Sequence, residues 1–330
     1  MSLWRILAII GCAVTWRNEA AACTTTSTSL IDLGSKTSFE AAAAQVGAGS
    51  GSSGLTCSGI LGLLSSQYIF LSVDSKSSGL VNSVTGDSIP FDVTTIPGGV
   101  PLVAGVTSGN LALASLLSLG GSSGQAQLFI NLDAAGNVAS GTYPGTLTLR
   151  WHYAVCSSIS AVGICIGGWT RSAGITQGCA LGLCTLTQNS IPGAGAAVTV
   201  TVRLTVTRDC RFDADDIDFG RAPFVDSFAP VSGALRLTCT KGTTYSVGLS
   251  NGNSFANGRR RMGFGVHRLE YDVFRPGGVP WNDVVHRAVQ SVPALGNVPE
   301  SFTYEARIYS DQPTPPAGVY QDVLVIDVLF

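Results

Sequence analysis

Charged side chains are scarce in this sequence, and neither sign dominates. Asp, Glu, Lys and Arg make up 12% of the 330 residues, whereas a typical soluble protein has about 25%. The 19 basic and 21 acidic residues leave a formal net charge of −2, which provides no overall field to attract nucleic acid or an anionic membrane. The one basic run, Arg259 to Arg261, is therefore expected to be a solvated loop or a paired sheet edge rather than a binding patch.

Helical periodicity is also nearly absent. In its place are short alternations of apolar and polar residues, interrupted by Asn, Ser and many of the 40 Gly and 14 Pro residues. This pattern is typical of an all-β sandwich. No segment is long and apolar enough to span a bilayer as a helix.

Catalytic and metal-binding motifs are missing as well. The sequence contains no nucleophile elbow, phosphate loop or metal triad, and its three His residues lie on separate segments. His152 alternates with Trp151 and Tyr153 on an expected strand, so we predict that it faces outward and is inert. The aspartates at 213, 215, 216 and 218 lack the Gly and the distal Glu of a calcium loop, and we predict that they shape a turn. We expect no enzyme activity, catalytic residue, metal ion or cofactor.

The first 22 residues have the features of a secretory signal peptide. Arg5 gives a positive start, Ile6 to Trp16 is apolar, and Ala20 to Ala22 are the small residues that precede cleavage. A second interpretation treats Ile9 to Cys12 as a lipoprotein box with an acylated cysteine, although the apolar run before it is very short. The first interpretation predicts export of the chain after removal of residues 1–22.

Eight cysteines follow the signal, at Cys23, Cys57, Cys156, Cys165, Cys179, Cys184, Cys210 and Cys239. An even number in an exported chain predicts disulfide bonds. Zinc is the alternative, but the spacings from 156 to 184 are not the paired knuckles of a structural zinc site, and no His lies among them. The four cysteines of that segment allow three pairings, which the sequence leaves open.

The C-terminal part of the chain contains six expected strands. Their alternating residues are Cys210 and Phe212; Leu235, Leu237 and Cys239; Tyr245, Val247 and Leu249; Leu269, Tyr271 and Val273; Phe302, Tyr304, Ala306 and Ile308; and Leu324, Ile326, Val328 and Phe330. The last strand has no cap or tail after it. An immunoglobulin-like sandwich has seven strands, so we expect this one to lack a strand and to need it from elsewhere.

The two halves of the chain repeat one another. Cys23, the turn Asp32-Leu33-Gly34 and Cys57 recur as Cys210, Asp218-Phe219-Gly220 and Cys239, and Gly141-Thr-Tyr143 with its alternating strand recurs as Gly318-Val-Tyr320 with the terminal strand. We infer two related sandwiches with corresponding bridges, Cys23–Cys57 and Cys210–Cys239. Only the first half continues into an alternating run, Val198 to Val206, which we predict to be its own seventh strand.

An ordered set of short motifs points to a family. The set is Asp209-Cys210, Ile217-Asp-Phe-Gly220, Leu237-Thr-Cys239, Tyr245-Ser-Val-Gly-Leu249, Arg261-Met262, Leu269-Glu-Tyr271, Tyr304-x-x-Arg307-Ile308 and Gly318-Val-Tyr320-Gln-Asp322. With it, residues 209–330 resemble the spore coat protein U-like domain, which pilins of archaic chaperone–usher pili use. Residues 23–207 match only in the repeated elements. A pilin of this family has a short donor strand before its first cysteine, and here a whole domain takes that place.

The resemblance implies a tip subunit that receives a strand and donates none. It implies a signal peptide (1–22), an N-terminal adhesin domain (23–207) and a C-terminal pilin domain (208–330), reaching the pilus tip at the cell surface through the periplasm. The implied partners are a periplasmic pilus chaperone, an outer-membrane usher and an adjacent pilin subunit that donates a strand. Leu324, Ile326, Val328 and Phe330 would line the donor-strand groove, and the subunit would promote attachment and biofilm formation.

Unusually apolar loops of the first domain are the candidates for the adhesive surface. Their residues are Ile96, Pro97, Val100, Leu102, Val103, Leu116, Leu117, Val162, Ile164, Ile166, Trp169, Leu181 and Leu183. We predict that these loops gather at the distal end and attach to an abiotic or host surface by hydrophobic burial. The alternative is that they fold back over the sandwich core.

Two other functions stay open. A lectin-like tip would bind a glycan, with Trp169 and Trp281 as the candidate aromatic residues. A structural secreted coat protein would need no strand from a partner.

Overall fold

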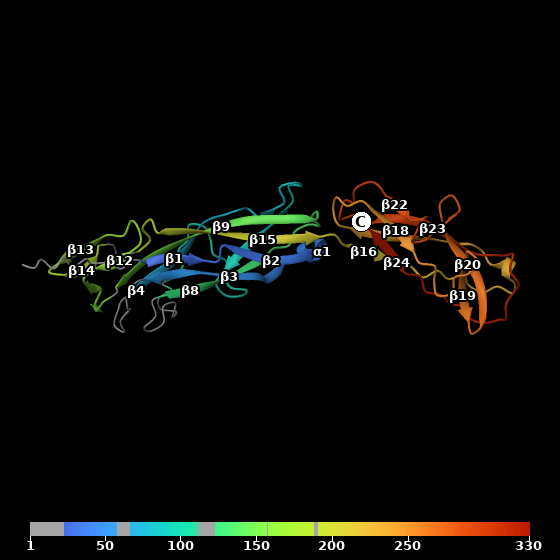
Figure 1. Cartoon of the computed structure of the whole chain (residues 1–330), viewed down its shortest axis with the longest axis horizontal. Coiled ribbons are helices and arrows are strands. Elements are labelled where there is room, and N and C mark those ends of the chain that lie inside the picture. Colours follow the sequence, from blue (N-terminus) through green and yellow to red (C-terminus); the bar gives the residue numbers. More distant parts are fainter. Residues whose placement is uncertain (1–22, 58–66, 110, 112–122, 157, 188–190) are drawn as a thin grey trace, which may run out of the picture.

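The computed structural model describes residues 23–57, 67–109, 111, 123–156, 158–187 and 191–330. Two β-sandwiches lie end to end along the long axis of the molecule (Figure 1). Strands β1 to β15 form the first sandwich and its extension, and β16 to β24 form the second. The predicted all-β class with two immunoglobulin-like sandwiches is confirmed.

The first sandwich packs two sheets around one core. One sheet has the order β1 (Cys23–Ser27), β3 (Gln45–Cys57), β8 (Ser123–Leu132) and β7 (Phe91–Thr94). In the other, β9 (Gly141–Cys156) pairs with β4 (Gln67–Lys76) on one edge and with β15 (Ala196–Thr207) and β12 (Trp169–Arg171) on the other, and β15 also pairs with β2 (Leu30–Thr37). A hairpin of β5 (Leu80–Val81) and β6 (Ser88–Ile89) completes the sandwich.

Strand alternation builds this core. On β9 the inward residues Leu147, Leu149 and Trp151 are fully buried, and on β15 the apolar residues from Val200 to Val206 are buried while the residues between them face outward. Alternate side chains of a strand point to opposite faces, so an apolar residue at every second position gives one buried face. The predicted seventh strand of the first sandwich is thus confirmed as β15.

Beyond Cys156 the chain forms a small additional sheet of order β10 (Ser160–Ala161), β11 (Ile164–Ile166), β14 (Leu183–Leu186) and β13 (Gln177–Ala180). The disulfides Cys156–Cys165 and Cys179–Cys184 brace it, which selects one of the three pairings. Its core includes Trp169, Ile175 and Ile191 and packs against β4 and β9. This braced extension, residues 158–187 with the 191–195 loop, lies at the end of the molecule farthest from the second sandwich (Figure 1).

The second sandwich has fewer long strands. One sheet has the order β16 (Cys210–Asp213), β17 (Val231–Cys239), β23 (Glu300–Ile308), β20 (His267–Arg275) and β19 (Arg260–Phe264), with β21 (Val279–Pro280) beside β20. The other has the order β22 (Ala288–Gln290), β18 (Tyr245–Leu249) and β24 (Ile326–Leu329). The terminal strand is thus shorter than the predicted run from Val323 to Phe330.

The internal repeat extends to individual hydrogen bonds. Tyr143 donates its hydroxyl to the carbonyl of Ala139, and Tyr320 donates to that of Pro316, each four residues earlier in the chain. The Gly34 amide donates to Asp32 Oδ1 at 3.0 Å, and the Gly220 amide donates to Asp218 Oδ1 at 2.8 Å. The disulfides Cys23–Cys57 and Cys210–Cys239 also correspond, because each joins directly paired residues of two neighbouring strands.

The junction between the sandwiches has polar contacts of its own. Asn137 Nδ2 donates to the carbonyl of Gly296 at 2.6 Å, Lys241 forms an ion pair with Asp87, and the hydroxyls of Ser38 and Thr240 are 2.8 Å apart. Ser38 begins α1 (Ser38–Ala41), whose N-terminus carries a capping box. The described helices are α1 and the 3₁₀ turn η2 (Val225–Ser227), and no described helix is long and apolar enough to cross a bilayer.

Candidate functional site

The edge of β24 is the first candidate site, and the first sandwich shows what its counterpart looks like when complete. There β9 has a partner strand on each edge, because β4 and β15 pair with the same stretch from Leu147 to Trp151. β15 in turn separates β9 from β2: it runs antiparallel to β9 and parallel to β2.

In the second sandwich the corresponding place is vacant within the described residues. β24 pairs antiparallel with β18, the counterpart of β4, on one edge. Residues 215–221 are the counterpart of β2 by the shared Asp-x-Gly turn, and they pair with no strand. No described strand lies between this segment and β24. We call β24 and residues 215–221 the acceptor edge.

Apolar side chains are less buried in the second sandwich, where this strand is missing, than at the same positions of the first. Leu147, Leu149 and Trp151 of β9 are completely buried. Their counterparts Leu324, Ile326 and Val328 are only half-buried against the second core, as are Ile217 and Phe219 across the acceptor edge. Phe330, the last residue of the predicted groove set, is 51% exposed. The acceptor edge therefore presents apolar side chains that this sandwich covers only partly.

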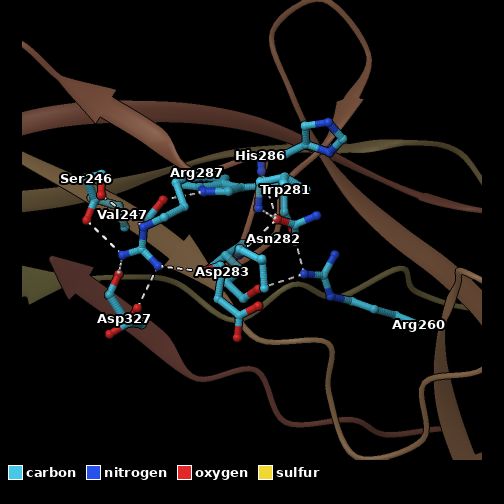
Figure 2. Close-up of polar contacts among 12 residues, drawn as sticks. Ser246, Val247, Arg260, Trp281, Asn282, Asp283, His286, Arg287 and Asp327 are labelled. Carbon is cyan, nitrogen blue, oxygen red and sulfur yellow. Dashed lines mark hydrogen bonds and ion pairs between the residues drawn. The ribbon is translucent and has the colours of Figure 1, made fainter.

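Arg287 holds β24 on its paired edge (Figure 2). Its guanidinium donates to the carbonyls of Ser246 and Asp327, each at 3.0 Å, and pairs with the Asp327 carboxylate at 2.6 Å. It crosses Gly248, where an added Cβ would lie 2.6 Å from Nη1. A side chain at position 248 would thus displace Arg287. With glycine there, Arg287 holds β24 against β18 on one edge, and the other edge of β24 stays open.

Arg260 is a structural residue that the sequence did not reveal. The prediction that the run Arg259 to Arg261 forms a solvated loop or a paired sheet edge holds for Arg259, which is partly exposed and pairs with Glu270 and Asp311. Arg260 itself is 1% exposed and pairs with the buried Asp272. It also donates to the carbonyls of Ser250 and Trp281 at 2.8 and 2.6 Å. Nothing in the run of three arginines distinguishes the buried one.

The second candidate site is a pair of hairpin turns in the braced extension. β10 and β11 are joined by Val162 and Gly163, and β13 and β14 by Leu181 and Gly182. Both turns have positive φ at both central residues, with 50° at Val162 and 51° at Leu181. Such turns favour Asn-Gly or Asp-Gly, because a larger L-residue in the left-handed region is strained. Both apolar side chains are nevertheless completely exposed.

The other predicted adhesive residues differ in how exposed their side chains are. Ile96, Pro97, Val100 and Val103 are exposed, as are Ile166 and Leu183; Leu102 and Ile164 are half-buried; Trp169 is 3% exposed; and Leu116 and Leu117 lie outside the described residues. The loop from 95 to 109 is tied to the edge of β4, where the Gly105 amide donates to the Val73 carbonyl. Val73 pairs with Leu149. Leu149 is seven residues before Cys156 on β9, or ~24 Å along the strand, and the braced extension begins at Cys156. The two described loops, 95–109 and the one in the braced extension, therefore do not form one cluster.

His152 differs from its predicted environment. It lies on the outer side of its sheet, as alternation requires, but it is 5% exposed. Its Nε2 is 3.0 Å from the hydroxyl of Ser72, and burial lowers the pKa of the imidazole. The cause is the 191–195 loop, which packs against the ring: a Cβ added at Gly195 would lie 2.9 Å from Cε1 and Nδ1 of His152. Sequence alternation identifies the face of a strand but not what covers it.

Trp169 and Trp281, the candidates for glycan stacking, are both buried and hydrogen-bonded. Trp169 donates to the Cys184 carbonyl at 3.0 Å, and Trp281 donates to the Val247 carbonyl at 2.8 Å. Neither indole offers a face to a sugar.

The geometry defines a class of protein: paired immunoglobulin-like sandwiches of which the second has an open sheet edge. Residues 196–327 match the model of the Spore Coat Protein U domain, so this part of the chain is identified as such a domain. The match begins at the first residue of β15, ahead of the first cysteine of the second sandwich, and so includes the whole of that strand. The predicted resemblance is confirmed for this domain.

Comparison with known proteins supports the two-sandwich fold. In a sequence comparison, no curated protein matches the chain. Among solved structures, a chain of the CsuC–CsuE chaperone–tip adhesion subunit pre-assembly complex from the archaic chaperone–usher Csu pili of Acinetobacter baumannii matches with a TM-score of 0.59 and 24% identity. That match covers 94% of this chain and 100% of the other. The CupB6 tip adhesin from Pseudomonas aeruginosa matches with a TM-score of 0.34 and 11% identity over 93% and 94% of the two chains.

Proposed function

We propose that this protein is a tip adhesin of an archaic chaperone–usher pilus that attaches cells to surfaces and promotes biofilm formation. The observation that carries the proposal is the pairing of β24, which has one partner strand where its counterpart β9 has two. An open edge with half-buried apolar residues is a template for an added strand. The second sandwich would therefore join the fibre by accepting a strand from another subunit.

The same arrangement supports a terminal position in the fibre. The segment ahead of Cys210 is β15, and its pairing with β9 and β2 already uses both of its edges. No other described strand is free to be donated. The partners would be a periplasmic chaperone, as in the solved Csu complex, then an outer-membrane usher and an adjacent pilin. The protein would reach the cell surface through the periplasm.

Strand acceptance is tested by adding a synthetic peptide of alternating apolar and polar residues to the full mature chain. A ligand at 100 times its Kd stabilises the folded state by about 2.7 kcal/mol, which corresponds to a rise of ~10 °C in the Tm of the second sandwich. Tryptophan fluorescence follows this transition through Trp281 and that of the first sandwich through Trp151 and Trp169. A peptide of the same composition in scrambled order is the control. Equal Tm values with both peptides would contradict strand acceptance and would favour a structural coat protein.

Adhesion is assigned to Val162 and Leu181, which are completely exposed in strained backbone positions. A strained conformation persists only where the surrounding structure enforces it, and such positions gather at functional sites. Here the flanking strands and the two disulfides of the braced extension supply the enforcement. Burying one such side chain against an apolar surface contributes roughly 1.5–3 kcal/mol before the costs of binding.

The adhesion test uses Asn, which suits these turns better than Val or Leu. Val162→Asn and Leu181→Asn should leave the fold as stable as before or slightly more stable. They should reduce attachment of piliated cells to polystyrene by about tenfold or more, since ~1.4 kcal/mol is a factor of ten. Val84→Asn is the matched control, because Val84 is 90% exposed but lies in the turn between β5 and β6. Unchanged attachment by the double variant with normal piliation would refute hydrophobic adhesion at these turns.

A glycan-binding tip is the second candidate. Its two candidate residues, Trp169 and Trp281, are buried, and the aromatic side chains exposed among the described residues, such as Phe212 and Phe224, lie in the second sandwich. A glycan array with the full chain in complex with its chaperone separates the two functions. Specific glycan binding that survives the double variant would favour the lectin.

A further inference from the structure

The first sandwich contains a template for the strand that the second one lacks. This inference rests on the proposed strand acceptance and concerns the sequence of the accepted strand. β15 occupies, between β9 and β2, the place that is vacant between β24 and residues 215–221. The register of β15 therefore indicates which positions of an incoming strand meet which residues of the acceptor edge.

The register can be transferred residue by residue through the shared motifs. In the first sandwich Leu204 lies opposite Tyr143 and Val200 lies opposite Leu147. The corresponding positions of the second sandwich are Tyr320 for Tyr143 and Leu324 for Leu147, and the repeat aligns these two pairs without a gap. On the other side Val202 lies opposite Ile31, which corresponds to Ile217. An incoming strand thus needs apolar residues at these alternate positions.

Between the apolar positions of β15 lies one cation. Arg203 is opposite Asp32 in the register and forms an ion pair with its carboxylate. The hydrogen bond from Arg203 is the largest cause that lowers the pKa of Asp32. Asp32 is thus held by two partners, the Gly34 amide within its own turn and Arg203 on the inserted strand.

Asp218 has a glycine amide of its own turn as a partner, as Asp32 does, but no arginine among the described residues. Its Oδ1 accepts the Gly220 amide at 2.8 Å, as Asp32 accepts the Gly34 amide. Among the described ion pairs none includes Asp218, nor its exposed neighbours Asp215 and Asp216. Residues 215–221 therefore carry three carboxylates against one guanidinium, that of Arg221, and Asp218 occupies the position that binds a cation in the completed sandwich.

We infer that the strand which completes the second sandwich carries a basic residue directly after the apolar residue opposite Ile217, and that this residue pairs with Asp218. The partner is a strand of alternating apolar residues with one Arg or Lys on its outward face. The nearby Asp215 and Asp216 add attraction for such a strand without a fixed partner position.

The ion pair would determine the register. A slip by one residue turns every apolar side chain to the wrong face, so the apolar pattern alone prevents it. A slip by two residues keeps the apolar face inward, and the apolar pattern then discriminates poorly. That slip moves the cation by about 6.8 Å along the strand, beyond the reach of Asp218. Only the correct register satisfies both requirements.

The expected effect is modest, because both groups are exposed to solvent. An exposed ion pair changes an affinity by up to about fivefold, and the change shrinks as salt is added. The charge therefore selects a register, while the affinity comes from the apolar side chains.

The test uses the full mature chain and a synthetic peptide with the sequence of Ala196–Thr207 as the probe. Three further peptides replace Arg203 by Gln, replace it by Glu, or move the Arg to position 205. Affinities are measured by fluorescence anisotropy at low and high salt. The parent peptide should bind about two- to fivefold more tightly than the Gln and moved-Arg peptides and more tightly still than the Glu peptide, with the differences reduced at high salt.

Asp218→Asn is the key chain variant, since Asn keeps the acceptor for the Gly220 amide. It should remove the preference for Arg, and Asp218→Lys should reverse it in favour of the Glu peptide. Asp215→Asn is the matched control and should preserve the preference. Equal affinities of all peptides for the unaltered chain, or equal effects of the two Asn variants, would overturn the inference while leaving strand acceptance intact. Failure of every peptide to bind would overturn strand acceptance and this inference together.

Discussion

The two sandwiches share a disulfide, an Asp-x-Gly turn and a tyrosine corner, and they differ by one strand. In the first, β15 covers Leu147 and Leu149 completely. In the second, Leu324 and Ile326 occupy the same positions and remain half-buried. Alternation thus specifies which face of a strand is apolar, whereas a neighbouring strand is needed to bury that face.

The sandwiches also differ in how their interiors are held. The ion pairs described within the first sandwich, such as Arg203 with Asp32 and Lys76 with Asp92, are all partly exposed. The second contains Arg260 and Asp272, whose side chains are 2% and 3% exposed. Its open core therefore contains a buried ion pair that has no counterpart among the ion pairs described in the closed core.

The largest predicted effect concerns the loss of one partner of this buried ion pair. Arg260→Met leaves the Asp272 carboxylate buried without its partner, which should cost the second sandwich about 3–5 kcal/mol. Urea denaturation followed by tryptophan fluorescence measures the loss as a shift of the transition that involves Trp281, while the transition that involves Trp151 and Trp169 of the first sandwich should stay as before. Arg260→Met with Asp272→Leu should recover most of the stability, because it removes both charges. A double variant as unstable as the single one would show that the ion pair is not the cause.

A second prediction compares one leucine in each sandwich. Leu204→Ala removes a completely buried side chain from β15 and should cost about 2–5 kcal/mol. Leu324→Ala removes a half-buried one and should cost on the order of 1 kcal/mol in the chain alone. With a donor peptide bound, the cost at Leu324 should rise toward that at Leu204. Equal costs without peptide would mean that the second core is already closed.

The smallest predicted effect concerns acid. Arg203, and after it the Gly34 amide, lower the pKa of Asp32 below its ordinary value of 3.8. A carboxyl whose folded-state pKa is lowered stabilises the fold above its unfolded-state pKa, and that stabilisation is lost as the pH falls through the folded-state value. The Tm of the first sandwich should therefore fall slightly more on acidification below about pH 4 than that of Asp32→Asn. Identical acid dependence of the two proteins would show that the Asp32–Arg203 pair does not stabilise the fold.

Several features were predictable from the sequence because they depend on local order. The run from Val198 to Val206 has the period of a strand, and the repeated Asp-x-Gly turn and Gly-x-Tyr corner depend on contacts within four residues. The two bridges of the repeat followed from the same order. The pairing of Cys156 with Cys165 did not, since three arrangements fit the spacing and a folded hairpin selects among them.

Other features depend on contacts between distant segments. The apolar turns at Val162 and Leu181 were recognisable as apolar, but the strained backbone that presents them belongs to the folded hairpins. The burial of Arg260 depends on carbonyls of two other segments, and that of His152 on the loop at Gly195. The apolar loop around Val100 was predicted at the distal end, and its attachment to β4 places it partway along the sandwich.

Alternation, turn residues and repeated motifs act over a few neighbouring residues, so the sequence alone was enough to predict a disulfide-containing chain of two related sandwiches. Which apolar side chains are covered, which arginine is buried and which turns are exposed all depend on contacts between distant segments, which the sequence does not specify. The physical reason is that burial is a property of what packs against a residue, and along β24 one of those neighbours is not among the described strands of this chain.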